Sequence, residues 1–198
     1  MTAVIEGKWV LGAPREVQEV KNAIDAYDLM LELNPYSEED LLRAHKLMLA
    51  ELVHENGRYR GGNVGVFRGD KCEHMAPPAA NVPSLMRDLL AWAERMSVHA
   101  LISSCVFHYE FEFIHPFSDG NGRMGCMWQT LLLMRWNPLF AWLPVESVVK
   151  EHQQAYYDAI AQSDALGEST PFVRFMLRTL LTALLEMKES LPSTLKSQ

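Results

Sequence analysis

The chain has 198 residues, of which 48% are hydrophobic and 22% are charged, so it can form one compact domain with at most a short appendage. Its formal net charge of −7 argues against bulk binding to nucleic acid or to an anionic membrane surface. No apolar run reaches the roughly 18 residues that a membrane span needs, and the N-terminus lacks the basic and apolar regions of a signal peptide.

The cysteines indicate the redox environment. There are three, Cys72, Cys105 and Cys126, and their spacing shows no pairs. An odd, unpaired set does not form a disulfide framework. We therefore expect a reducing compartment and a cytoplasmic protein.

Apolar residues recur mostly with the period of a helix. Val20, Ile24 and Tyr27 share one face of a first helix expected at 15–34. Ser37, with an acid three residues later, predicts the start of a second helix at 37–55. Further helices are expected, in chain order, at 83–96, 98–114, 122–136, 145–164 and 170–189. The stretch 98–114 is apolar on almost every side, which is typical of a central, buried helix.

One segment departs from the helical pattern. Val64, Gly65, Val66 and Phe67 form a short strand-like run, and a second run follows near His74 and Met75. This pattern weakly predicts a β-hairpin, and an ordinary surface loop is the alternative. Without a repeat or an interdomain linker, we expect a single all-α domain with one small hairpin.

The segment "HPFSDGNGRMGCM", from His115 to Met127, carries the chemistry. Gly120, Asn121 and Gly122 lie between two predicted helices, where free amides and the helix dipole form an anion cradle. Arg123 adds a donor fork for phosphate oxygens, and Asp119 is a hard ligand suited to Mg²⁺.

Two alternatives concern the histidines. His115 can accept a proton near neutral pH, and with the cradle it predicts phosphoryl or nucleotidyl transfer. A plain glycine-rich turn is the simpler interpretation. His108, Glu112 and His115 also share a helical face and could bind zinc. Their spacing does not match the zincin pattern, so we expect His108 to be a core residue. Arg58, Arg60 and Arg123 remain candidates for a local basic pocket.

The residues from His115 to Arg123 match the pattern H-x-F-x-[DE]-G-N-G-R of the Fic family, which this chain resembles over most of its length. "GRYRGGNVGVF" resembles the segment that leads into the family's hairpin flap, and "AYYDAI" resembles part of its nucleotide pocket. The resemblance implies an α-helical bundle of Fic type with a small β-hairpin flap. It also implies an enzyme, a protein adenylyltransferase that moves AMP from ATP to a Tyr, Thr or Ser hydroxyl.

The resemblance also assigns roles to residues. His115 would be the general base, Phe117 would fix the loop, and Asp119 would hold Mg²⁺. The remaining residues would bind nucleotide or align the target segment: Gly120, Asn121, Gly122, Arg123, Tyr156 and Tyr157 for the nucleotide, and Val64, Gly65, Val66, Phe67, His74 and Met75 for the flap. The two tyrosines could equally be one core residue and one surface residue.

The sequence departs from the pattern at Cys126, where the family has a final arginine that grips the γ-phosphate. A thiol cannot replace that charged fork. Cys126 is therefore either a small packing residue or a reactive thiol near a helix N-terminus. The departure leaves room for another phosphate-containing donor, for removal of AMP, or for a module that binds nucleotide or protein without turnover.

The N-terminal "TAVIEG" resembles the family's inhibitory-helix motif. Thr2, Glu6 and Gly7 would be regulatory, with Glu6 directed at the missing arginine. We therefore divide the chain into an inhibitory-motif segment at 1–14, a Fic domain at 15–190 and a tail at 191–198. The expected partners are ATP and a hydroxyl-bearing protein, with no nucleic acid or membrane, and a homodimer stays open.

Overall fold

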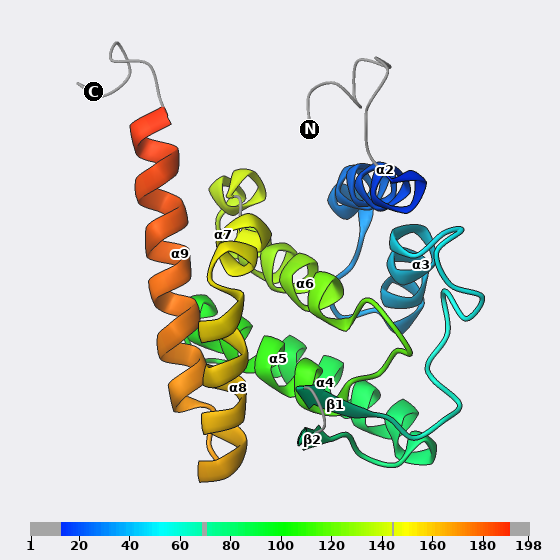
Figure 1. The fold of residues 1–198 in the computed structure, drawn as a ribbon. Helices are drawn as coiled ribbons and strands as arrows, with labels where there is room; N and C mark the ends of the chain where they lie inside the picture. Colours follow the sequence, from blue (N-terminus) through cyan, green and yellow to red (C-terminus); the bar gives the residue numbers. More distant parts are fainter. Residues whose placement is uncertain (1–12, 69–70, 144, 191–198) are drawn as a thin grey trace.

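Two buried helices lie at the centre of the fold, α5 (Ala100–Ile114) and α6 (Asn121–Trp136). They pack on each other along their length (Figure 1). The computed structural model describes residues 13–68, 71–143 and 145–190. Thr2, Glu6, Gly7 and the segment 191–198 therefore lie outside the described residues.

The N-terminal elements cover one side of this pair. They are α2 (Pro14–Leu29), the 3-10 turn η1 (Met30–Glu32), α3 (Glu38–Met48), the turn η2 (Ala79–Asn81) and α4 (Val82–Arg95). Ser37 caps α3 as expected, because its Oγ accepts the Asp40 amide at 3.2 Å. The prediction of one helix over 37–55 is wrong at its C-terminal end. The chain turns after Met48, and Glu51 takes a positive φ of 61°.

The C-terminal elements cover the other side (Figure 1). They are η3 (Pro138–Trp142), α7 (Val145–Glu151), α8 (Gln153–Leu166) and α9 (Thr170–Ser190). The expected single helix at 145–164 is broken at His152, whose φ of −108° and ψ of 31° are not helical. The break lets α7 and α8 both pack on α9.

The central helix α5 contributes to two separate hydrophobic clusters. Phe107 and Phe111 join the cluster formed with the N-terminal elements, whereas Cys105 and Tyr109 join the cluster formed with the C-terminal elements. A helix with core on both sides has no polar face, which accounts for its apolar sequence. The same double packing fixes the loop that follows α5.

A short strand pair lies beside this bundle. β1 (Gly65–Arg68) pairs antiparallel with β2 (Lys71–Met75), with Val66 opposite His74. The register slips between Val66 and Phe67. The pair lies near α8, the helix that carries Tyr156 and Tyr157.

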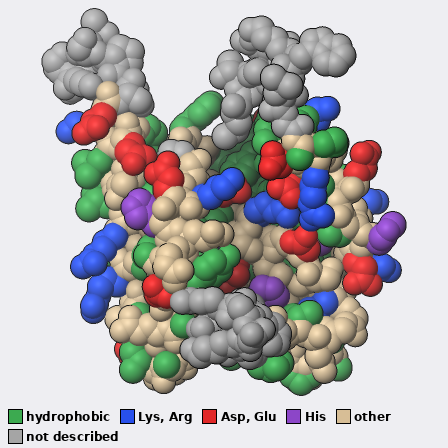
Figure 2. Space-filling view, in the orientation of Figure 1, with side chains coloured by type: hydrophobic (Ala, Val, Ile, Leu, Met, Phe, Trp, Pro, Cys, Tyr) green, Lys and Arg blue, Asp and Glu red, His purple; other side chains and the backbone are tan. Residues whose placement is uncertain are grey.

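The surface carries charges of both signs. On the face in Figure 2, Lys and Arg side chains lie interleaved with Asp and Glu side chains. This face therefore offers no broad basic surface of the kind that binds a nucleic-acid backbone. None of the helices in the described ranges has the length and apolar character of a membrane span.

Candidate active site

The loop between α5 and α6 begins at a backbone position that is rare for a side chain. His115 caps α5 with φ 50° and ψ 61°, in the left-handed region. Such conformations cost free energy and persist where surrounding contacts impose them, often at active sites. The amide of His115 bonds to the Phe111 carbonyl at 2.9 Å, and its own carbonyl accepts a bond from Arg60 at 2.7 Å. The half-buried ring therefore has a fixed anchor.

Asn121 closes the loop through its side chain. Its Oδ1 accepts the Phe117 amide and its Nδ2 donates to the Phe117 carbonyl, each at 2.9 Å. The side chain is buried and its hydrogen bonds are used within the loop. Asn121 is also the first residue of α6, where main-chain N–H groups have no helical partner. Any contact of Asn121 with an anion would therefore be made by its main chain.

The two glycines of the loop play different parts. Gly120 has φ 83°, and an added Cβ would lie 2.6 Å from Leu49 Cδ2, so only glycine fits there. Gly122 is exposed, and an added Cβ would meet no atom of the described residues within 4 Å. Its open side lets a ligand approach the amides at the start of α6.

His45 holds the loop from α3, a role that the sequence did not reveal. Its ring stacks on Phe117 at a centroid distance of 3.7 Å and an angle of 7°. Nδ1 accepts the Gly57 amide at 2.9 Å, so Nε2 carries the proton and donates to the Asp119 carbonyl at 3.1 Å. Burial lowers the pKa of His45 to about 4 and keeps the ring neutral. The only signal in the sequence is a histidine on the apolar face of an amphipathic helix.

Asp119 lies at the mouth of the loop with its side chain 43% exposed. Its Oδ1 accepts the Gly120 amide at 2.6 Å and lies 3.8 Å from Arg123 Nη2. Its Oδ2 lies 3.6 Å from Arg15 Nη2, on the first turn of α2. The described residues hold no cluster of three or more His, Cys, Asp or Glu side chains able to bind a metal. A lone accessible carboxylate fits Mg²⁺, which usually takes one or two protein ligands plus substrate phosphates and water.

Arg60 is not available for a basic pocket, contrary to one interpretation of the sequence. Its side chain is buried, and its donors reach the carbonyls of His115, Gly62 and Pro77 at 2.7, 2.8 and 2.6 Å. A longer bond of 3.3 Å reaches Ile114. Arg60 thus ties the end of α5 to both chain segments that flank the strand pair.

Arg123 and Cys126 share a helix but not an environment. Arg123 Nη1 is buried and has no hydrogen-bond partner among the described residues, so one donor of a guanidinium that is 22% exposed is left unused. Cys126 is 2% exposed and belongs to the cluster on the α9 side. Burial first, then the carboxylates of Glu146 and Glu112, raise the pKa of the Cys126 thiol well above its usual value. The thiol stays protonated, which favours the packing role over the reactive one.

The two adjacent tyrosines separate into one core and one surface residue. Tyr156 is buried, and its hydroxyl lies 3.1 Å from His108 Nε2. Tyr157 is 41% exposed, and its hydroxyl accepts a bond from Gln153. His108 is fully buried and its Nδ1 lies 2.7 Å from Gln129 Oε1, which confirms its place in the core. Of the two tyrosines, only Tyr157 presents a ring to solvent.

The flap residues lie on the strand pair as follows. Val64 directly precedes β1, and its carbonyl accepts the Ala76 amide at 3.3 Å. Gly65, Val66 and Phe67 form β1, while His74 and Met75 end β2. Met75 is 65% exposed. A strand at the edge of a sheet can pair with an extended peptide through its main chain.

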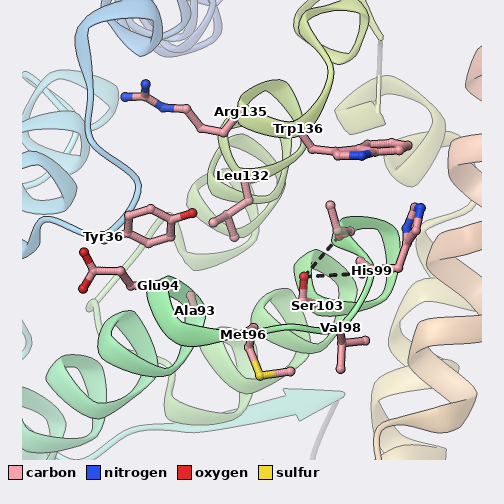
Figure 3. A pocket seen from close by; sticks show the side chains of 11 residues that line it. Tyr36, Ala93, Glu94, Met96, Val98, His99, Ser103, Leu132, Arg135 and Trp136 are labelled. Carbon is pink, nitrogen blue, oxygen red and sulfur yellow. Dashed lines mark hydrogen bonds between the residues drawn. The ribbon is translucent and has the colours of Figure 1, made fainter.

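A separate pocket of about 400 Å³ lies elsewhere (Figure 3). It is lined by the C-terminal ends of α4 and α6 and the N-terminal end of α5, with Tyr36, His99 and Trp136 around it. No residue of the loop from His115 to Arg123 lines it. The chemistry of the loop is therefore not located in this pocket.

Known proteins are similar to this chain in sequence. The chain is 31% identical over 142 residues to the protein adenylyltransferase Fic of Aedes aegypti, covering 70% of this chain and 26% of that protein. It is 26% identical over 181 residues to the protein of the same name from Nematostella vectensis, covering 89% and 38%. The chain thus spans well under half the length of these relatives.

Solved structures share the fold. A Fic family protein from Desulfovibrio desulfuricans G20 superposes with a TM-score of 0.89 at 53% identity, covering 97% of this chain and 60% of that one. Fic-1 of C. elegans superposes with a TM-score of 0.74 at 24% identity, covering 96% and 58%, which shows the fold alone. The model of the Fic/DOC family matches residues 35–133, half of the chain. The chain belongs to the Fic/DOC family.

Proposed function

We propose that this chain is a protein adenylyltransferase that moves AMP from ATP to a Tyr, Thr or Ser hydroxyl of a target protein. The observation that carries the proposal is the loop itself. His115 stands at the start of one loop and Arg123 just after it, where Arg123 Nη2 lies 3.8 Å from Asp119 Oδ1 and Arg123 Nη1 has no hydrogen-bond partner in the described residues. The relatives in Aedes aegypti and Nematostella vectensis, both named protein adenylyltransferases, support the same reaction.

The residues would divide the reaction as follows. His115 takes the proton from the target hydroxyl, whose oxygen bonds to the α-phosphorus, and pyrophosphate leaves as the bond to the β-phosphate oxygen breaks. Asp119 would hold Mg²⁺, which supplies charge neutralisation at the phosphates. The amides at the start of α6 and the guanidinium of Arg123 stabilise the developing negative charge.

The remaining contacts would be made with the target segment and with the adenine ring. Tyr157, exposed on α8, would stack on the adenine, and the strand pair would align the target segment by main-chain pairing.

The buried free thiols of Cys105 and Cys126 fit a reducing compartment such as the cytoplasm.

Cys126 favours a second candidate, a donor other than ATP, because this position offers no charge to a γ-phosphate. One experiment tests both candidates. The protein is incubated with Mg²⁺, a cell lysate and either ATP labelled on the α- or the γ-phosphate or a second nucleotide that carries a phosphate label. Protein labelling from the α-position alone is expected. Labelling only from another nucleotide would favour the second candidate.

A further inference from the structure

Two guanidinium groups approach the same carboxylate from different helices. Arg123 Nη2 lies 3.8 Å from Asp119 Oδ1, and Arg15 Nη2 lies 3.6 Å from Oδ2. Arg123 belongs to α6 and to the loop motif, whereas Arg15 belongs to the first turn of α2 and to no motif. Packing therefore adds to the site a cation that the pattern in the loop does not contain.

Position 126 does not supply such a cation. Cys126 is 2% exposed within a hydrophobic cluster, and its thiol is uncharged. Among the loop residues from His115 to Cys126, Arg123 is the one permanent cation. A bound triphosphate would leave its outer phosphates without a second guanidinium from the first turns of α6, because the other arginine of that helix, Arg135, lies in its last turn and donates to the Leu33 carbonyl.

Arg15 is free to change partners. Its side chain is 63% exposed, and its contacts with Asp119 at 3.6 Å and Glu19 at 3.4 Å are exposed ion pairs, which are weak. Mg²⁺ held by Asp119 would repel the guanidinium from the carboxylate. The same cation brings phosphate oxygens close to Asp119, within the region that Arg15 already occupies, and a planar guanidinium fits phosphate oxygens well.

We propose that Arg15 binds the outer phosphates of the nucleotide and supplies there the charge that Cys126 does not. This inference rests on the proposed function, because it assigns a nucleoside triphosphate to the loop. It makes Arg15 a binding residue that favours triphosphates over monophosphates.

Calorimetry with ATP and AMP, each with Mg²⁺, tests the proposal on the parent, Arg15→Gln and Arg15→Lys. Arg15→Gln should weaken ATP binding about 3- to 10-fold, between the effect of an exposed ion pair and that of a charge-assisted hydrogen bond, and leave AMP binding unchanged. Arg15→Lys should retain part of the ATP affinity. The matched control is Arg43→Gln on α3, because Arg43 is 54% exposed and pairs with Glu32 at 3.6 Å; it should change neither affinity.

The contrary outcomes are distinct. Equal ATP affinity in the parent and Arg15→Gln would overturn the role of Arg15 while leaving the proposed function intact. An equal loss of affinity for ATP and AMP would indicate a general disturbance of the loop. Tighter ATP binding would indicate that Arg15 competes with Mg²⁺ for Asp119. Either result overturns the proposal. A parent that binds neither nucleotide would overturn the proposed function first.

Discussion

The guanidinium of Arg60 donates a 2.7 Å hydrogen bond to the carbonyl oxygen of His115 and so holds the strained end of α5. Arg60→Ala would remove the donor from the carbonyls of His115, Gly62, Pro77 and Ile114. We expect a loss of about 2–4 kcal/mol in the free energy of unfolding, measured by urea denaturation. Arg58→Ala is the control, since Arg58 is 64% exposed and pairs only weakly with Glu55. Equal effects of the two changes would show that Arg60 is not a structural clamp.

His115→Ala tests the base. Because the amide cradle and Arg123 remain, we expect ATP binding to persist while transfer of the α-phosphate label falls about 10²- to 10⁴-fold. The exposed His54→Ala should transfer label at the parent rate. Labelling by His115→Ala as fast as by the parent would remove His115 from the chemistry.

The glycines of the loop should respond in opposite ways. Gly120→Ala places a Cβ 2.6 Å from Leu49 at a positive φ, so we expect a loss of about 1–3 kcal/mol in stability. Gly122→Ala lies in open space at the start of α6, so stability should stay level or rise by up to about 1 kcal/mol. Its methyl group should nevertheless weaken ATP binding. Thermal unfolding and calorimetry separate the two effects, and unchanged ATP binding in Gly122→Ala would mean that ligands do not approach this face.

Stability should depend on pH through His45 and His108. Burial lowers the pKa of each to about 4, so between pH 6.5 and 4 the unfolded state binds more protons and stability falls as the pH falls. Each histidine accounts for roughly 3 kcal/mol over that window. The raised pKa values of Glu110 and Glu146 act in the opposite direction, so the parent must be compared with His45→Gln. The variant should take up about one proton fewer on unfolding near pH 5. An identical pH dependence in both proteins would contradict the buried, neutral state of His45.

Cys126→Arg tests the missing charge together with Glu6, which lies outside the described residues. Cys126 is buried, so a guanidinium at 126 must extend past its hydrophobic cluster to reach a phosphate, where a charge-assisted hydrogen bond would be worth about 10- to 150-fold in binding. The guanidinium would also give Glu6 an inhibitory partner. Label transfer is measured at saturating ATP for the parent, both single variants and the double variant. We expect Glu6→Gly to leave the transfer rate of the parent almost unchanged and to raise that of Cys126→Arg.

Glu146 offers a second possible partner for an arginine at position 126, which the comparison of the four proteins must take into account. Glu146, after burial, helps to raise the pKa of the Cys126 thiol, and its Oε2 accepts a 3.2 Å hydrogen bond from the Tyr27 hydroxyl. Glu146 could therefore form an ion pair with the arginine at position 126 in place of Glu6. Equal effects of Glu6→Gly in both backgrounds would show that Glu6 does not act through position 126, and adding Glu146→Gln would then reveal whether Glu146 had taken its place.

The sequence by itself determined the local features. Helical periodicity located the elements around α5 and α6, Ser37 identified the start of α3, and the apolar stretch 98–114 identified the buried helix. The residues from His115 to Arg123 predicted a turn between two helices, which the structure has with Gly120 at φ 83°, and the binding of an anion there stays a prediction. These features depend on contacts within a few residues, which a local pattern records.

The tertiary structure decided the contacts between distant segments. It placed Arg15 beside Asp119, used Arg60 as a clamp on His115, and stacked His45 under the loop, although none of these pairs is close in sequence. It also broke the helix expected at 145–164 at His152, and the two resulting helices, α7 and α8, both pack on α9. Which of Tyr156 and Tyr157 is buried depends on the face that α8 turns to the core. Side-chain roles of this kind follow from packing between elements, and local periodicity does not encode them.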